Sequence, residues 1–78
     1  MEEKYILVEV YGSKVICNCP YSSLETAKES LSAAFDNITN DIYNLEYGKD
    51  CWKSDDGMSA WAIHKNQDRV WSIVKALR

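Results

Sequence analysis

The stretch that decides the fold lies in the last third of the chain and reads Asp56-Gly57-Met58-Ser59-Ala60-Trp61-Ala62-Ile63-His64, then Lys65-Asn66-Gln67-Asp68, then Arg69-Val70-Trp71-Ser72-Ile73-Val74. In the two outer runs apolar residues recur at every second position, and each run has a Trp followed two residues later by an Ile. Such alternation around a short polar break is typical of a β-hairpin with one buried face. The stretch predicts an antiparallel sheet and contains no catalytic motif.

A second hairpin is predicted near the N-terminus. Residues 4–11 alternate, with Ile6, Val8 and Val10 on one face and Tyr5, Leu7, Glu9 and Tyr11 on the other. Gly12-Ser13 supplies a two-residue turn, because Gly readily adopts positive φ. Residues 14–19 form the partner strand, and Pro20 is expected to end it.

An amphipathic helix follows. Ser22-Ser23-Leu24-Glu25 has the pattern of a capping box, in which a Ser hydroxyl and a Glu three residues later satisfy backbone amides. The apolar stripe behind it has helical spacing and consists of Leu24, Ala27, Leu31, Ala34, Phe35 and Ile38. We expect the helix to break at Thr39-Asn40-Asp41, which favour turns, although Ile42 and Leu45 would prolong the same stripe.

Two later segments have alternative interpretations. Residues 48–57 are expected to form a loop, in which Trp52 either folds back over the core or is an exposed anchor for a partner. The C-terminal residues Val70, Ile73, Val74 and Leu77 also fit helical spacing, with Asp68 as a cap. We favour the strand, because Val, Trp and Ile prefer sheets.

The predicted fold class is therefore α+β, with about four antiparallel strands in the order ββαββ and one helix packed on one face. Residues 1–78 form a single small domain, whose length is close to the minimum for a self-sufficient core. The order of the strands in the sheet does not follow from the pattern. We expect the aromatic residues of the strands to form the core under the helix: Tyr5, Tyr11, Trp61 and Trp71.

Composition limits the classes of partner. The net charge of −3 disfavours binding to nucleic-acid phosphates. The chain contains no apolar run of the roughly 18 residues that a membrane span needs, so no membrane partner is expected. The start, Met1-Glu2-Glu3-Lys4, lacks the pattern of a signal peptide, which predicts a cytoplasmic location.

The chain has few groups for catalysis or metal binding. Cys17, Cys19, Cys51 and His64 have the number and type of ligands of a structural zinc site. However, the sulfurs of a Cys-x-Cys pair on a strand are expected roughly 7 Å apart, and buried cysteines that act as small hydrophobes explain them better. His64 has no paired nucleophile in the sequence. We therefore expect no cofactor, no metal and no enzymatic activity, with a small metal-binding domain as an alternative.

The charge is unevenly distributed. Six acidic residues lie between positions 36 and 56: Asp36, Asp41, Glu46, Asp50, Asp55 and Asp56. Such a segment is either a solvated loop or a surface that attracts a basic partner. The candidate partner-binding residues are Asp50, Trp52, Asp55 and Asp56.

The C-terminal hairpin also carries a resemblance. Ser59-Ala60-Trp61-Ala62, followed by Asp68-Arg69-Val70-Trp71-Ser72-Ile73, is similar to the ending of small uncharacterised open reading frames of phages and prophages in Gram-positive bacteria. The similarity covers about residues 57–74 and implies no catalytic residue. It implies a small accessory protein of a mobile element, a class that often binds and blocks host defence proteins.

The expected function is therefore non-enzymatic. The first expectation is a protein-binding accessory protein, such as an anti-CRISPR-like inhibitor of a bacterial defence protein. The second is a self-associating structural protein, because one helix covers only one face of a sheet and leaves the other for a homodimer partner. The third is the small metal-binding domain.

Overall fold

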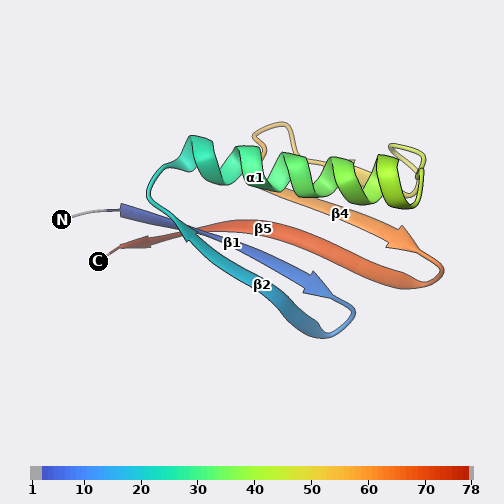
Figure 1. The fold of residues 1–78 in the computed structure, drawn as a ribbon, viewed down its shortest axis with the longest axis horizontal. Helices are drawn as coiled ribbons and strands as arrows, with labels where there is room; N and C mark the ends of the chain where they lie inside the picture. The colour runs from blue at the N-terminus through green and yellow to red at the C-terminus, as the bar shows by residue number, and fades with distance from the viewer. Residues whose placement is uncertain (1–2, 78) are drawn as a thin grey trace.

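The computed structural model describes residues 3–77, so Met1, Glu2 and Arg78 lie outside the described part of the chain. Two long strands, β1 (Glu3–Tyr11) and β5 (Gln67–Leu77), pair antiparallel along their whole length in the middle of the sheet. This pairing places the two ends of the chain side by side (Figure 1). Residues far apart in sequence therefore form the centre of the fold.

The two predicted hairpins are confirmed. In the first, Tyr11 pairs with Lys14 around a turn in which Gly12 has a φ of 64°. In the second, Lys65 and Asn66 form the turn with φ values of 52° and 65°, as a two-residue hairpin loop requires. The C-terminal segment is a strand, and the alternative of a terminal helix is wrong. The hairpins are completed by β2 (Lys14–Tyr21) and β4 (Ser59–His64).

The end of the second strand differs from the prediction. Pro20 does not end β2, which continues to Tyr21. Because β2 is an edge strand, the missing N–H of Pro20 leaves no neighbour unpaired. A bulge at Ile16 also shifts the register, since Glu9 pairs with Cys17 and Val10 with Val15.

The sheet has five strands, in the order β2-β1-β5-β4-β3, and not the predicted four. The extra strand, β3 (Cys51–Lys53), lies within the segment that we expected to be a loop. Cys51 is buried and pairs with Ala62, which fixes the strand. Three residues are too few to produce a recognisable alternation, so the sequence did not reveal β3.

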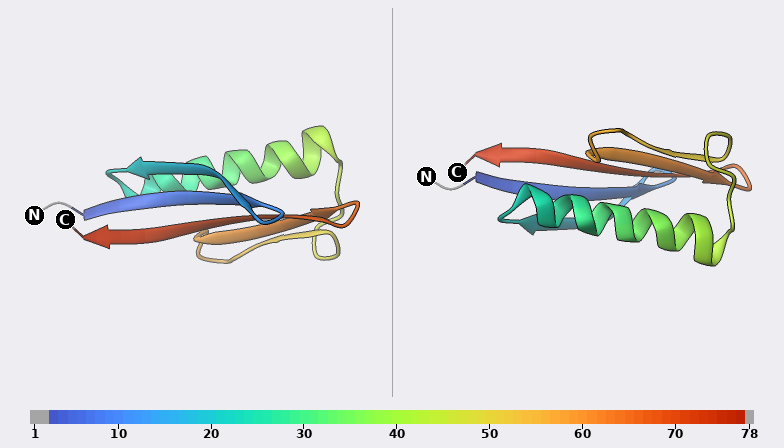
Figure 2. Two further views of the ribbon diagram at one scale, coloured as in Figure 1. Left: turned by 90° about the horizontal axis from the view of Figure 1, so that it is seen from below. Right: turned by 90° about the horizontal axis from the view of Figure 1, so that it is seen from above.

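The predicted helix is present as α1 (Leu24–Asp36), which lies across one face of the sheet (Figures 1 and 2). Its N-cap is Ser23, whose hydroxyl accepts a hydrogen bond from the Thr26 amide at 3.5 Å. The cap therefore lies one residue later than the predicted capping box, and Glu25 is an exposed first-turn residue.

The predicted break at Thr39-Asn40-Asp41 is wrong. The chain continues as a π-helix, η1 (Asn37–Ile42), in which the Tyr43 amide donates to the Ile38 carbonyl at 3.1 Å. Thr39 is buried, and its hydroxyl donates to the Phe35 carbonyl at 2.8 Å. Satisfying this hydroxyl within the helix allows a turn-favouring residue to remain helical.

The core lies between α1 and the sheet. Trp71 is fully buried and meets the ring of Phe35 edge-on, with centroids 5.7 Å apart. Beside Trp71, Ala60 and Ala62 leave room for these two rings. The buried apolar residues are Leu7, Ala27, Leu31, Phe35, Ile38, Cys51, Ala60, Ala62, Trp71 and Ile73.

The matched Trp residues of the C-terminal hairpin do not share a face. Trp61 pairs with Val70, whereas Trp71 pairs with Ala60. Because Val70 and Trp71 are consecutive on β5, their side chains point to opposite faces. Trp71 and Ile73 are buried under α1, and Trp61 and Ile63 lie on the other face. The expectation that Trp61 belongs to the core under the helix is therefore wrong.

Handedness explains which face α1 covers. The antiparallel pairings make the two edge strands β2 and β3 parallel to one another. The connection from β2 through α1 to β3 is thus a crossover, and it is right-handed in Figure 1. Nearly all such crossovers are right-handed, because of strand twist. Only one face of this sheet is therefore available to the helix.

Candidate protein-docking surface

The side of the sheet opposite α1, here called the open face, is the main surface feature of the molecule. Both views in Figure 2 show α1 on one side of the sheet and no helix on the other. The side chains of the open face alternate with the core residues along the strands. Between its two ends they are Val15, Asn18 and Pro20 on β2, Ile6, Val8 and Val10 on β1, Val70, Ser72 and Val74 on β5, Ser59, Trp61 and Ile63 on β4, and Trp52 on β3.

Most of the open face is apolar and accessible. The exposed fractions are 61% for Val15, 50% for Val74, 43% for Ile63, 40% for Trp52 and 38% for Val70. The charged residues of this face, Lys4 and Asp68, lie at its two ends, and none lies among the apolar side chains. Contiguous apolar patches larger than a few hundred Å² are rare on soluble monomers and often mark interaction sites.

Trp52 is the sequence-predicted candidate that belongs to the open face. It lies on β3 directly across from Trp61, so two indoles are neighbours at this side of the sheet. Tyr47, in the loop before β3, anchors the end of this strand. Its hydroxyl donates to the Lys53 carbonyl at 3.0 Å and accepts from the Lys53 amide at 3.2 Å. Trp52 is therefore an exposed aromatic side chain on an anchored strand.

The three candidate acids lie on the loops around β3. Asp56 accepts hydrogen bonds from the Ser54 hydroxyl at 2.6 Å and the Met58 amide at 3.0 Å. These bonds, that from Ser54 above all, lower the pKa of Asp56. Asp50 accepts from the Glu46 amide at 3.3 Å, and Asp55 is exposed. Asp50 and Asp56 thus stabilise turns, and the three acids do not join the apolar patch.

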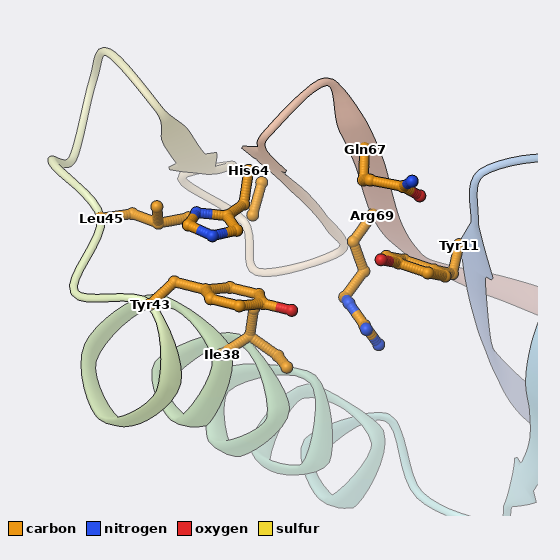
Figure 3. Close-up of a pocket in the computed structure, with 8 residues that line it drawn as sticks. Tyr11, Ile38, Tyr43, Leu45, His64, Gln67 and Arg69 are labelled. Atoms are coloured by element: carbon orange, nitrogen blue, oxygen red, sulfur yellow. The ribbon is translucent and has the colours of Figure 1, made fainter.

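The hairpin end of the covered face holds a cluster of charged and aromatic groups (Figure 3). Arg69 forms an ion pair with Glu9 at 2.5 Å, and its guanidinium lies 4.4 Å from the centroid of the Tyr11 ring. The ring of His64 stacks on that of Tyr43, with centroids 3.9 Å apart. The cavity between them has a volume of about 10 Å³, room for about one water molecule. The cluster is therefore a packed junction and not a ligand pocket.

A larger hollow of about 360 Å³ lies between the end of the helix and the loop before β3. Its one cationic group, Lys53, is already engaged, because its ammonium donates to the Ser32 hydroxyl at 2.9 Å and lies 5.7 Å from the centroid of the Phe35 ring. The hollow is open to solvent and has mixed polarity. Its residues are Phe35, Asp36, Thr39, Asn40, Leu45, Tyr47, Cys51 and Lys53.

The cysteines do not form one site. Cys17 and Cys19 lie on edge strand β2, whereas Cys51 lies on β3 at the opposite edge. The predicted metal set with His64 is therefore not brought together, and the described residues contain no group of three or more His, Cys, Asp or Glu side chains arranged for a metal ion. The Cys17 and Cys19 sulfurs are 3.0 Å apart and not the expected 7 Å, because both side chains lean toward each other.

Comparison with protein-family models, curated proteins and solved structures finds no match. Among the described residues, no helix combines the length and apolar character needed to cross a membrane.

The sequence analysis left the second face of the sheet for a homodimer partner but did not say which residues line it, although their signal is visible. Both faces of β1 and β5 contain apolar side chains, since Ile6, Val8 and Val10 alternate with Leu7 and flanking aromatics. A strand with one face in water normally alternates apolar and polar residues. The second face of this sheet is therefore more apolar than a sheet face in water normally is.

Proposed function

We propose that this protein acts by binding another protein through the open face of its sheet. The observation that carries the proposal is the row of exposed apolar side chains from Val15 to Trp52, across all five strands, with no charge among them. Interface centres are depleted of charged residues and enriched in aromatic ones. Trp52 and Trp61 are the side chains that we expect to contribute most to binding.

The class of partner follows from the sequence resemblance and stays a proposal. A small accessory protein of a phage-type element, acting on a bacterial defence protein, is compatible with a fold that offers an apolar binding surface. The acidic residues Asp50, Asp55 and Asp56 lie on the loops beside the Trp52 side of the open face. They are proposed to form a charged rim there, which affects the rate of association more than the affinity.

The test is a comparison of matched variants. Val74 and Ile42 are similarly exposed, at 50% and 55%, but Val74 lies on the open face and Ile42 at the end of η1. Tagged wild-type protein, Val74→Lys and Ile42→Lys are used to capture partners from a Gram-positive host lysate, and the captured proteins are identified by mass spectrometry. A partner that is retained by Ile42→Lys and lost by Val74→Lys supports the open face.

A partner that both variants retain argues against this surface. In that case the triple variant with Asp50, Asp55 and Asp56 changed to Lys tests the acidic rim as the main contact. The control is the triple variant with the same three residues changed to Asn. It removes the charge but keeps hydrogen-bonding groups at Asp50 and Asp56, so that the turns are retained.

A further inference from the structure

We infer that the open face is occupied by a second copy of this chain, related by a two-fold axis that lies between the two sheets and perpendicular to the strands. The inference rests on the proposed function, because it concerns the same surface, but its occupant is a second copy of the chain in place of a host protein. Three features of the open face support it: the alternation of small and large side chains, the charges at its two ends, and its area.

The first feature is a pair of small side chains on β5 and β4 beside a pair of larger ones. Ser72 pairs with Ser59, and the next row on this face contains Val70 and Trp61. A two-fold axis between the rows and perpendicular to the strands sets the serine row of each copy against the Val70–Trp61 row of the other. Large side chains then fill the space above small ones, as close packing between sheets requires.

The other simple arrangement, with the axis parallel to the strands, does not have this complementarity. It sets each row against the same row of the second copy. The two serine rows then leave a gap, while the Trp61 rows hold the sheets apart. An interface with such voids loses the contacts that stabilise it.

Charge gives an independent argument for the same axis. On the open face Lys4 lies at the end of β1 that carries the chain termini, and Asp68 lies at the other end, on β5. Both residues are exposed. The perpendicular axis brings the Lys4 end of one copy over the Asp68 end of the other, which gives an ion pair at each end. The parallel axis instead brings like charges together.

The area of the open face is sufficient for a weak dimer. Strands about 4.8 Å apart and about 3.3 Å per residue give a face of roughly 500 Å² per copy. Two copies bury roughly 1,000 Å² if both faces are treated as flat, which is at the lower limit of specific interfaces. We therefore expect a dimer in exchange with the monomer, whose fraction rises with protein concentration.

The first experiment is sedimentation equilibrium between about 1 µM and about 1 mM protein. Wild type and Ile42→Lys are expected to change from the 9.0 kDa chain mass to twice that mass, whereas Val74→Lys remains at 9.0 kDa. Wild-type protein that stays monomeric over the whole range overturns the inference.

The second experiment tests the axis. Lys4→Glu and Asp68→Lys, made singly, are each expected to raise the dimer dissociation constant about three- to tenfold at low salt. The double variant restores the opposite charges and is expected to recover the wild-type constant. If the double variant is as weak as the single ones, the perpendicular axis is wrong.

These results also separate the inference from the proposed function. A monomeric wild type whose host partner is lost by Val74→Lys and retained by Ile42→Lys overturns the second copy and leaves protein binding through the open face. A monomeric wild type with no effect of Val74→Lys on any partner overturns both.

Discussion

The two faces of the sheet differ in what they contact, although both are rich in apolar side chains. On the covered face Trp71 is fully buried against Phe35, and the charges of Glu9 and Arg69 neutralise one another in an ion pair. On the open face Trp52 and Val74 are 40% and 50% exposed, and no charged side chain lies among them. The covered face therefore stabilises the monomer, and the open face remains available for association.

The Trp-x-Ile motif occurs twice in this sheet, but its two copies have different roles. Trp61-x-Ile63 and Trp71-x-Ile73 have the same spacing, but the register of the hairpin places them on opposite faces. A shift of one residue in pairing inverts the two faces of a strand. The variants below test this division, beginning with the largest expected effect.

Trp71→Ala is expected to lower the free energy of unfolding by about 3–5 kcal/mol, because it removes a fully buried indole. Trp61→Ala is expected to lower it by about 1 kcal/mol, since this side chain is only half-buried. Urea denaturation followed by circular dichroism, at low protein concentration, measures both. Equal effects would show that the two faces contribute alike to the stability of the monomer.

Glu9→Gln leaves the Arg69 guanidinium without its carboxylate on the covered face, where the two side chains are 15% and 17% exposed. We expect a loss of about 2 kcal/mol in the free energy of unfolding. The double variant Glu9→Gln, Arg69→Met removes both charges and is expected to recover most of that loss. If Glu9→Gln alone has no effect, the pair is not part of the stabilising face.

Val70→Lys on the open face is expected to change the free energy of unfolding of the monomer by less than about 0.5 kcal/mol. Its side chain already faces solvent in the isolated chain. The same variant is expected to prevent association, which light scattering measures. Strong destabilisation at low concentration would mean that the open face is needed for the monomer to fold.

An effect confined to high pH is expected at the margin of the covered face. The hydrogen bond with Cys19, together with burial, raises the pKa of the Cys17 thiol from 9.0 to about 11. The unfolded chain thus releases this proton first, so the stabilisation is complete below pH 9.0 and is lost as the pH rises to about 11. The urea midpoint of Cys17→Ser is expected to fall less over this interval than that of wild type. If the urea midpoints of Cys17→Ser and wild type fall equally with pH, the Cys17 thiol does not stabilise the fold in this way.

Much of the fold was predictable from local pattern. The turn at Gly12, the helical stripe through Leu31 and the strand character of Val70 to Val74 each depend on residues close in sequence. The continuation through Thr39 was missed because a threonine favours turns unless its hydroxyl has a partner, here the Phe35 carbonyl. The strand at Trp52 was missed because three residues carry no period.

Of the candidate site, the sequence supplied Trp52 and the acids, but not the valines and Trp61 around it. The alternation of apolar residues identifies which side chains share a face of a strand. It does not identify which of the two faces the helix covers. Where both faces of a strand are apolar, composition does not indicate which face is buried under the helix. Ile6 and Leu7 are an example, because they are consecutive apolar residues on opposite faces of β1.

The strands, the tight turns and the helix follow from local sequence, because backbone preferences and side-chain periodicity act over a few residues. Only the tertiary structure decided the strand order, through the pairing of β1 with β5 across almost the whole chain. That order makes β2–α1–β3 a crossover, and the right-handed twist of strands then assigns α1 to one face. The open face is the face of the sheet that this strand order and handedness leave without a helix.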